Sequence, residues 1–313
     1  MIRRVLVTGA SGFVSRALFR SCPSRISLIA ASRSPPDVDG IEFRASPELS
    51  GAANWKPLLE NVDAVIHLAG RVHAPADDQA SAYMVENAEG TSKLARDARE
   101  AGVGHFIFLS TAKVLGDESS GQALDEKAPA RPNDPYSKSK YAAEQALSAH
   151  GGPMRSTILR PPLVYGPGVR ANFLALLSAV DRGIPLPLAS IRNRRSLIGV
   201  DNLASAIFAC LDSPDAAGRI FHVSDGEPRS TPDLILAIAS AMRTPSKLFR
   251  FPPNLLEACG RIVGRGDMVK RLTRSLELDD RTIRSVLGWK APNTFAQGIE
   301  DTVRWYQSTS WSG

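Results

Sequence analysis

The chain has 313 residues, of which 43% are hydrophobic and 22% charged, and its formal net charge is +6. This composition excludes a disordered chain, and the three cysteines (Cys22, Cys210 and Cys259) have no paired spacing, so we expect neither a disulfide framework nor a CxxC metal site. No apolar run approaches the length of a membrane span, and no signal-peptide pattern is present. We therefore expect a cytoplasmic protein in a reducing compartment, with no membrane partner.

Basic residues are spread along the chain and are densest between residues 261 and 284. Acidic residues interrupt that stretch, and no aromatic residues alternate with the basic ones, which favours a solvated helical face. A binding site for an anionic small molecule is the second interpretation, and nucleic acid is the third. We expect no nucleic-acid partner.

Short, apolar, β-branched stretches alternate with helical ones in the first two-thirds of the chain. Strands are predicted at residues 5–8, 27–31, 64–68, 105–110 and 157–159, and helices at residues 13–21, 81–101 and 136–148. This alternation predicts an α/β fold of the Rossmann type, a doubly wound parallel sheet with right-handed crossovers.

The pattern changes after Pro161, where turns rich in proline and glycine precede further helices and a late strand at residues 219–223. The organisation that we predict has two parts. Residues 1–165 form the dinucleotide-binding domain, to which residues 196–224 return, and residues 166–195 and 225–313 form a smaller, mostly helical substrate-binding lobe at the carboxyl edge of the sheet.

The first predicted strand runs directly into a glycine-containing turn that opens a helix. Without a Cβ, the backbone there can approach a pyrophosphate closely, and the N–H groups at the helix start face the anion. Ser15 replaces the usual third glycine and is small enough to allow helix–strand packing. The residues expected to contact the dinucleotide here are Gly9, Ser11, Gly12, Phe13 and Val14.

The end of the second strand distinguishes the two nicotinamide dinucleotides. NAD-binding proteins usually have an acidic residue there for the adenosine ribose, whereas this chain has Ser32 and Arg33. A guanidinium suits a 2′-phosphate, and Arg16 is placed to supply a second one. We predict NADP(H), with NAD(H) as the alternative; Arg33 could instead be a surface residue stacked on the adenine.

Tyr136 and Lys140 lie four residues apart in a helix predicted to begin at Pro135, so they share one helix face. A free tyrosine hydroxyl has a pKa of about 10, and a nearby ammonium lowers it by stabilising the tyrosinate. The fourth strand ends in Ser110 and Thr111, and Thr111 lies 25 residues before Tyr136. A hydroxyl there would face this helix across the cofactor cleft.

In this order, the motifs resemble the extended short-chain dehydrogenase/reductase family of the NAD-dependent epimerase/dehydratase type. The resemblance is greatest to UDP-N-acetyl-6-deoxyhexose 4-keto reductases and UDP-sugar 4-epimerases, and it covers nearly the whole chain. The other matching segments are residues 67–70, 87–91, 159–168, 194–203 and 287–289.

The resemblance implies how the active site works. Thr111 binds the sugar hydroxyl or carbonyl oxygen, Tyr136 is the general acid or base, and Lys140 lowers the pKa of Tyr136 and holds the nicotinamide ribose. Asn87 supports the region of the active-site lysine. Further cofactor contacts are implied for Leu68, Ala69, Gly70, Ser110, Pro161 and Val164.

On the substrate side, the resemblance implies that Arg195 binds the nucleotide diphosphate. It also implies that Asn172 contacts the sugar nucleotide and that Arg271 is a further phosphate ligand. Two of these have a simpler interpretation, because Asn172 could only begin a helix and Arg271 could be a surface charge. Lys113 resembles the lysine of the branch that acts on UDP-N-acetyl-6-deoxyhexoses; otherwise it points to solvent from a strand end.

The family's 4,6-dehydratases have an Asp-Glu pair where this chain has Ala112 and Lys113, so we do not expect a dehydratase. We expect an enzyme that uses NADPH to reduce the 4-keto group of a UDP-4-keto-6-deoxy-N-acetylhexosamine, for a surface polysaccharide such as lipopolysaccharide. A UDP-sugar 4-epimerase with tightly bound NAD would use the same residues. A non-catalytic dinucleotide sensor is the third alternative.

The resemblance also implies a homodimer, with the helices at residues 81–101 and 136–148 forming a four-helix interface with their symmetry mates. The five histidines have no ligand spacing, so we assign no metal. They are His67, His73, His105, His150 and His222.

Overall fold

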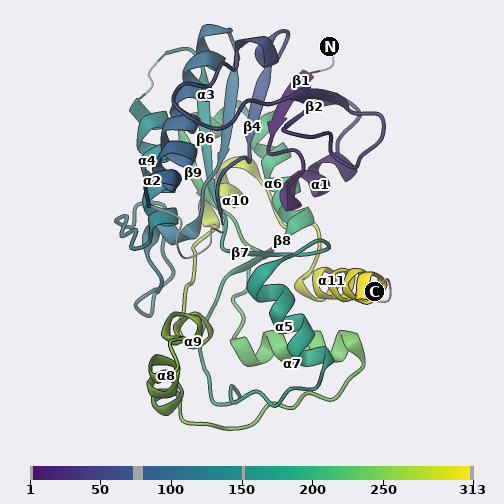
Figure 1. The fold of residues 1–313 in the computed structure, drawn as a ribbon, viewed down its shortest axis with the longest axis vertical. Coiled ribbons are helices and arrows are strands. Elements are labelled where there is room, and N and C mark those ends of the chain that lie inside the picture. Colours follow the sequence, from purple (N-terminus) through teal and green to yellow (C-terminus); the bar gives the residue numbers. More distant parts are fainter. Residues whose placement is uncertain (1–2, 73–79, 150–151, 311–313) are drawn as a thin grey trace.

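The computed structural model describes residues 3–72, 80–149 and 152–310, so His73 and His150 lie outside the described residues. A parallel sheet of seven strands forms its centre, in the order β3-β2-β1-β4-β5-β6-β9 (Figure 1). The strands are β1 (Arg3–Thr8), β2 (Ile26–Ser32), β3 (Glu42–Ala45), β4 (Ala64–His67), β5 (His105–Leu109), β6 (Arg155–Arg160) and β9 (Arg219–His222). The predicted fold class is therefore confirmed.

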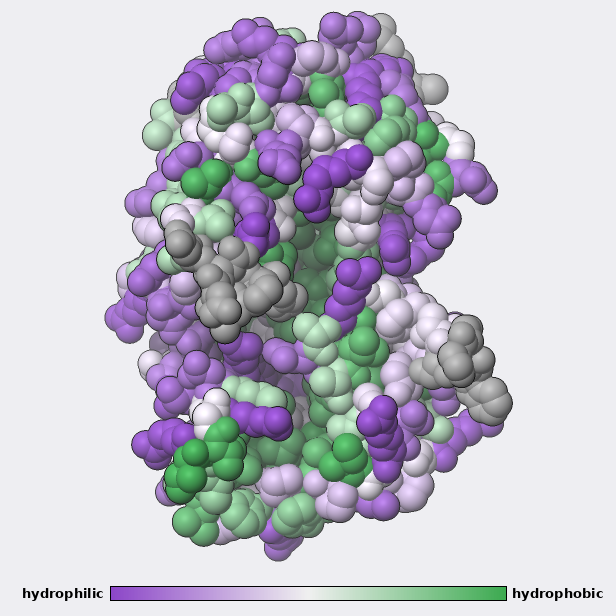
Figure 2. Space-filling model, viewed as in Figure 1, coloured by the Kyte–Doolittle hydropathy of each residue, from purple (hydrophilic) through white to green (hydrophobic). Residues whose placement is uncertain are grey.

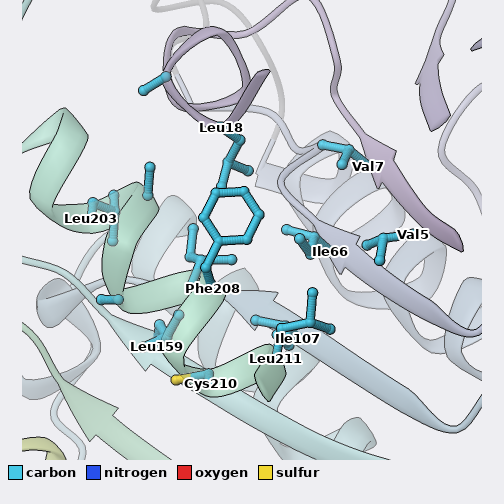
Figure 3. Packing of buried hydrophobic residues seen from close by; sticks show 14 of the residues in the cluster. Val5, Val7, Leu18, Ile66, Ile107, Leu159, Leu203, Phe208, Cys210 and Leu211 are labelled. Atoms are coloured by element: carbon cyan, nitrogen blue, oxygen red, sulfur yellow. The ribbon is translucent and has the colours of Figure 1, made fainter. Parts of the chain in front are cut away.

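Alternate residues of each strand face opposite sides of the sheet, and both sides are covered by helices. Val5 and Val7 pack with Leu18 of α1 (Phe13–Arg20) and with α6 (Val200–Asp212), as Figure 3 shows. Leu6, between the two valines, packs on the other side with α3 (Gly90–Glu100) and α4 (Pro135–Ala149). The alternating apolar side chains of the strands therefore form two cores with the sheet between them.

The strand order reverses between β1 and β4, and dinucleotides bind at such a switch point in doubly wound sheets. The carboxyl ends of β1, β2, β4, β5 and β6 lie along one edge because all the strands are parallel. The loops that follow these strands carry the predicted site residues.

A smaller lobe lies below this edge in Figure 1. Its core is formed by one side of α5 (Ala171–Asp181), α7 (Thr231–Met242) and α11 (Phe295–Ser310), with Tyr165 packed against Phe173. The remaining elements are β7 (Leu163–Tyr165), β8 (Leu197–Gly199), α2 (Ala80–Tyr83), a π-helical segment (Met84–Glu89), α8 (Pro253–Ile262), α9 (Gly266–Thr273) and α10 (Arg281–Leu287), with short 3-10 turns at Lys56–Leu59, Ala112–Leu115 and Pro214–Ala216.

The long predicted elements all form, and the structure adds three short strands, β3, β7 and β8, that no pattern indicated. The helix predicted at residues 81–101 contains the π-helical segment. The predicted domain boundary assigns Ile283 and Trp289 to the substrate lobe. In the structure, they pack in the core beside α1 and α6. Within the described residues, no helix is both long and apolar enough to cross a membrane.

Candidate active site

The turn between β1 and α1 requires glycine at two positions. Gly9 has a φ of +70°, and a Cβ there would lie 2.8 Å from the backbone nitrogen of Ala69. A Cβ on Gly12 would lie 2.9 Å from the carbonyl oxygen of Gly9. Because α1 begins directly after Gly12, its unpaired N–H groups lie beside this bare backbone, an arrangement that suits an anion.

Hydroxyl groups fasten this turn to its neighbours. Ser15 Oγ donates to the carbonyl oxygen of Gly9 at 2.7 Å, which explains how a serine replaces the third glycine. Thr8 Oγ1 lies 2.6 Å from His67 Nδ1 and accepts a hydrogen bond from the nitrogen of Ala69 at 3.3 Å. Burial, with the nearby Lys140, lowers the pKa of His67 to about 3, so this histidine is a neutral structural residue.

At the end of β2, Ser32 and Arg33 point in different directions. Ser32 is buried, and its hydroxyl donates to the carbonyl oxygen of Ser34 at 2.7 Å. Arg33 is exposed, and no carboxylate of the described chain forms an ion pair with it. Its guanidinium is therefore available to a ligand.

Tyr136 lies in the first turn of α4, which begins at Pro135 as predicted. Ser137 donates its backbone N–H to Asp134 Oδ1 at 2.7 Å, so Asp134 caps this helix. Thr111 directly precedes the 3-10 turn after β5, and its hydroxyl lies near enough to that of Tyr136 to affect the pKa of the tyrosine. The structure therefore brings together the predicted Thr111 and Tyr136.

Lys140 lies one turn further along α4 and is buried. Its Nζ donates to the carbonyl oxygen of Leu109 at 2.7 Å and lies 4.4 Å from the centre of the Phe108 ring. Burial lowers the pKa of Lys140 to about 8, and the negative charge of Glu144 opposes that change.

Burial also raises the pKa of Tyr136 above its ordinary value, although the hydrogen bond from Thr111 opposes the rise. Lys140 is not among the causes of this change, so the lowering of the Tyr136 pKa by Lys140 stays a prediction. The pKa of Tyr136 rises because desolvation of the phenolate costs more free energy than its interactions with the surrounding groups recover. Tyr136 is protonated and able to donate.

Asn87 joins the loop after β4 to α4. Its Oδ1 accepts from the nitrogen of Arg71 at 2.7 Å, and its Nδ2 donates to the carbonyl oxygen of Arg71 and to Ser139 Oγ, both at 3.0 Å. A Cβ on Gly70 would lie 2.8 Å from this Oδ1. Asn87 thus holds the helix that carries Lys140 in position, which agrees with the supporting role that the resemblance implies.

Ser110 contacts a buried ion pair that the sequence analysis missed. Its hydroxyl donates to Glu144, which also binds Arg160 through two bonds of 3.0 and 2.6 Å. The side chains of Arg160 and Glu144 are only 5% and 3% exposed. The feature of the sequence that could have indicated this ion pair is the position of Glu144, one helical turn after Lys140.

Lys113 forms an ion pair with Asp134, so it does not simply point to solvent. Its backbone N–H donates to Thr111 Oγ1 at 3.2 Å. The next loop is held close by, because Ala112 donates its N–H to the carbonyl oxygen of Pro161 at 2.8 Å. Thr111, Lys113 and the segment from Pro161 to Val164 therefore lie in one region.

The two predicted phosphate-binding arginines lie near each other. Arg195 Nη1 donates to the carbonyl oxygen of Arg274 at 3.0 Å. Burial lowers the pKa of Arg195; Asp117 opposes this, and the charge of Arg271 adds to it. Neither arginine has an ion-pair partner within the described part of the chain, and two guanidiniums suit a diphosphate.

Asn172 lies exposed in the first turn of α5.

Figure 2 shows the surface hollowed between the sheet domain and the lower lobe, with hydrophobic side chains inside the hollow. A cofactor cradle, a Thr/Tyr/Lys group and an arginine pair at the carboxyl edge of a Rossmann sheet define an enzyme that transfers hydride and protons.

Comparison with known proteins agrees with this class. The model of the NAD dependent epimerase/dehydratase family matches residues 5–224, and the chain belongs to this family. It is 36% identical over 314 residues to a protein named UDP-glucose 4-epimerase from Vibrio cholerae, covering 97% of this chain and 95% of the relative.

Two further likenesses cover almost the whole chain. A dTDP-glucose 4,6-dehydratase from Streptomyces griseus is 28% identical over 346 residues, covering 99% of this chain and 96% of the relative. The crystal structure of UDP-glucuronic acid 4-epimerase from Bacillus cereus in complex with NAD has the same fold, with a TM-score of 0.81, 20% identity and coverage of 99% and 98%. The chain is thus an NAD-dependent enzyme of the epimerase/dehydratase family.

Proposed function

We propose that this enzyme transfers hydride at C4 of a UDP-linked sugar, and that its first candidate activity is that of a UDP-sugar 4-epimerase. The observation that carries the chemistry is the proximity of Thr111 to the hydroxyl of Tyr136, with Lys140 one turn away on α4. The full-length similarity to the Vibrio cholerae protein supports epimerisation of a UDP-sugar.

The residues present fit a nicotinamide dinucleotide. Bare backbone at Gly9 and Gly12 beside the start of α1 would hold the pyrophosphate. An ammonium has three N–H donors, and within the described residues Lys140 Nζ donates only to Leu109, so it has donors left for ribose hydroxyls. When bound, the dinucleotide supplies or accepts the hydride. The structure with NAD from Bacillus cereus supports NAD as that cofactor.

The protein's own part in the reaction is to hold and protonate the sugar oxygen. Thr111 and Tyr136 would both bond the oxygen on C4. Oxidation of the sugar alcohol passes the O4 proton to Tyr136, which must first have lost its own, and reduction of the ketone takes that proton back. Arg195 and Arg271 would bind the diphosphate, at a distance from the reacting carbon.

A second candidate is the reduction of a UDP-4-keto-6-deoxy-N-acetylhexosamine by NADPH. The end of β2 favours it, because Arg33 is exposed and unpaired with any described carboxylate where NAD-binding proteins usually have an acid. A protonated Tyr136 is also ready for the direction of ketone reduction. A surface-polysaccharide sugar would be the product.

One experiment separates the two candidates. The purified enzyme is incubated without added cofactor with UDP-glucose, UDP-glucuronic acid and UDP-N-acetylglucosamine, and the product is identified by NMR. In parallel, the 4-keto substrate is added with NADPH or NADH and the absorbance of the reduced cofactor is followed. Appearance of the C4 epimer supports the first candidate, and stoichiometric loss of NADPH supports the second. If the folded enzyme gives neither signal, both candidates are refuted.

A further inference from the structure

Exposed hydrophobic side chains gather at one end of the molecule. Among the described residues, eleven large hydrophobic side chains are exposed, and five of them lie between residues 249 and 268. They are Phe249, Leu255, Ile262, Val263 and Met268. Figure 2 shows a hydrophobic surface at the lower left, where α8 and α9 lie in Figure 1. Scattered exposed side chains are ordinary, but a contiguous cluster marks an interaction site.

The inner face of α8 is firmly packed on α9. Gly260 is buried so closely against Val269 that a Cβ on the glycine would lie 2.6 Å from the valine Cγ2. Thr273 also donates to Glu257 Oε1 at 2.9 Å, which joins the two helices. The orientation of α8 is therefore set by its contacts with α9.

The outer face of α8 carries an apolar stripe. Leu255, Cys259 and Ile262 are spaced i, i+4 and i+7, so they lie along one side of the helix, and all three are exposed. Ile262 is 85% exposed, and Val263, directly after the helix, is 67% exposed. The stripe therefore faces away from the protein.

Positive charge surrounds this stripe. Residues 247–274 contain seven lysines and arginines and two acidic residues. Arg250, Arg261 and Arg265 are exposed, and none of them is ion-paired with a carboxylate in the described part of the chain. Unpaired positive charges therefore lie close to the exposed apolar side chains.

We propose that α8 and α9 dock the enzyme on an anionic lipid bilayer. Ile262 and Val263 would enter the headgroup region, while Arg261 and Arg265 contact lipid phosphates. A helix that lies in the interface needs no spanning length. The expectation of no membrane partner, which came from the lack of a spanning run, does not apply to this kind of binding.

The charges argue against a second copy of the chain as the occupant. A twofold contact through this surface would bring the positive charges of both copies into one interface, and residues 247–274 contain only two acidic residues, Glu257 and Asp267, to offset them. Docking would also place the candidate diphosphate site near the bilayer, because α9 carries Arg271, which is close enough to Arg195 to affect its pKa.

Flotation of the full-length enzyme with vesicles tests the proposal. We expect it to float with vesicles of equal parts phosphatidylglycerol and phosphatidylcholine, to stay behind with phosphatidylcholine alone, and to be released by high salt. Ile262→Glu/Val263→Glu should abolish flotation. Arg261→Glu/Arg265→Glu should weaken it by at least about tenfold, since each basic residue near an anionic surface contributes about a fivefold gain in affinity.

Matched variants control for charge and hydrophobicity elsewhere. Leu236→Glu changes a side chain on α7 that is 50% exposed, and Lys127→Glu/Arg219→Glu reverses two exposed charges outside the patch. These variants should float like the unchanged enzyme. All variants should keep its circular dichroism spectrum and thermal midpoint.

A probe on Cys259 reports the orientation. An environment-sensitive fluorophore on this exposed thiol, in a Cys22→Ser background, should shift its emission to the blue on the anionic vesicles. No flotation, flotation unaffected by Ile262→Glu/Val263→Glu, or flotation without an emission shift would each overturn the proposal. So would self-association, seen by light scattering, that this variant abolishes while vesicles remain unbound.

Discussion

Burial controls the chemistry of the two side chains that define the active site. It raises the pKa of the Tyr136 hydroxyl and lowers the pKa of the Lys140 ammonium to about 8, since it disfavours the charged form of each. Both remain within reach of partners, Tyr136 at Thr111 and Lys140 at the carbonyl oxygen of Leu109. The chain alone is therefore ready to donate a proton.

Tyr136→Phe should lower turnover by at least about 100-fold, because it removes the proton donor and retains the ring. Cofactor binding and the thermal midpoint should stay near those of the unchanged enzyme. Tyr141→Phe, on the same helix, is the matched control and should keep its activity. Full activity in the Tyr136 variant would remove this residue from proton transfer.

The pH dependence of kcat/KM should report Lys140 in the free enzyme. Its ammonium is the predicted ribose ligand, so kcat/KM should fall as the pH rises above about 8, where the amine loses its proton. Glu144 raises this pKa, so Glu144→Gln should move the alkaline limb to lower pH. A profile that keeps rising through this range would contradict the assignment.

At the scale of elements, buried polar contacts connect α4 to the sheet. Glu144 of α4 binds Arg160 at the end of β6 and Ser110 after β5, while Ser139 of α4 binds Asn87. Both contact points flank Lys140 in the sequence. The position of this lysine therefore depends on three separate segments of the chain.

Removal of one member of the buried ion pair should be costly. We expect Arg160→Met to lower the free energy of unfolding by about 3–5 kcal/mol, since it leaves Glu144 charged and buried without its partner. Glu144→Leu/Arg160→Met should be much closer to the unchanged protein, because neither charge remains. Urea unfolding measures both, and additive losses in the double variant would contradict this account.

The turn between β1 and α1 allows a matched test of why glycine is required at position 9. Gly9→Ala and Gly102→Ala both place a Cβ on a residue of positive φ, which costs about 1–2 kcal/mol. Only at Gly9 would the Cβ also contact backbone, 2.8 Å from the nitrogen of Ala69, whereas nothing lies within 4 Å at Gly102. Gly9→Ala should lose more stability and weaken dinucleotide binding in calorimetry; equal effects of the two variants would contradict the role of this contact.

At the scale of the whole molecule, the sheet domain and the lobe meet where the predicted site residues converge. Asp225, after β9, accepts hydrogen bonds from Tyr165 and from Asn202 of α6, and so joins the lobe core to the sheet domain. The expected homodimer stays a prediction. Met84 and Val85, on the helix predicted to form the interface, are 39% and 37% exposed.

If the dimer forms through this helix, Met84→Glu/Val85→Glu should convert the protein to a monomer in light scattering, because the variant places charges in an apolar interface. Leu236→Glu should not change its mass. A dimer that survives the first variant would place the interface elsewhere.

The sequence by itself determined the parts of this protein that depend on neighbouring residues. The alternation of buried strands and helices, the glycines after β1 and the spacing of Tyr136 and Lys140 are local patterns, so the fold class and the family followed from them. Tertiary structure decided the partners of Ser110, Asn87 and Lys113, since these lie 16 to 52 residues away in the chain. It also decided that the apolar stripe of α8 is exposed, because an amphipathic pattern is the same whether its face is buried or free.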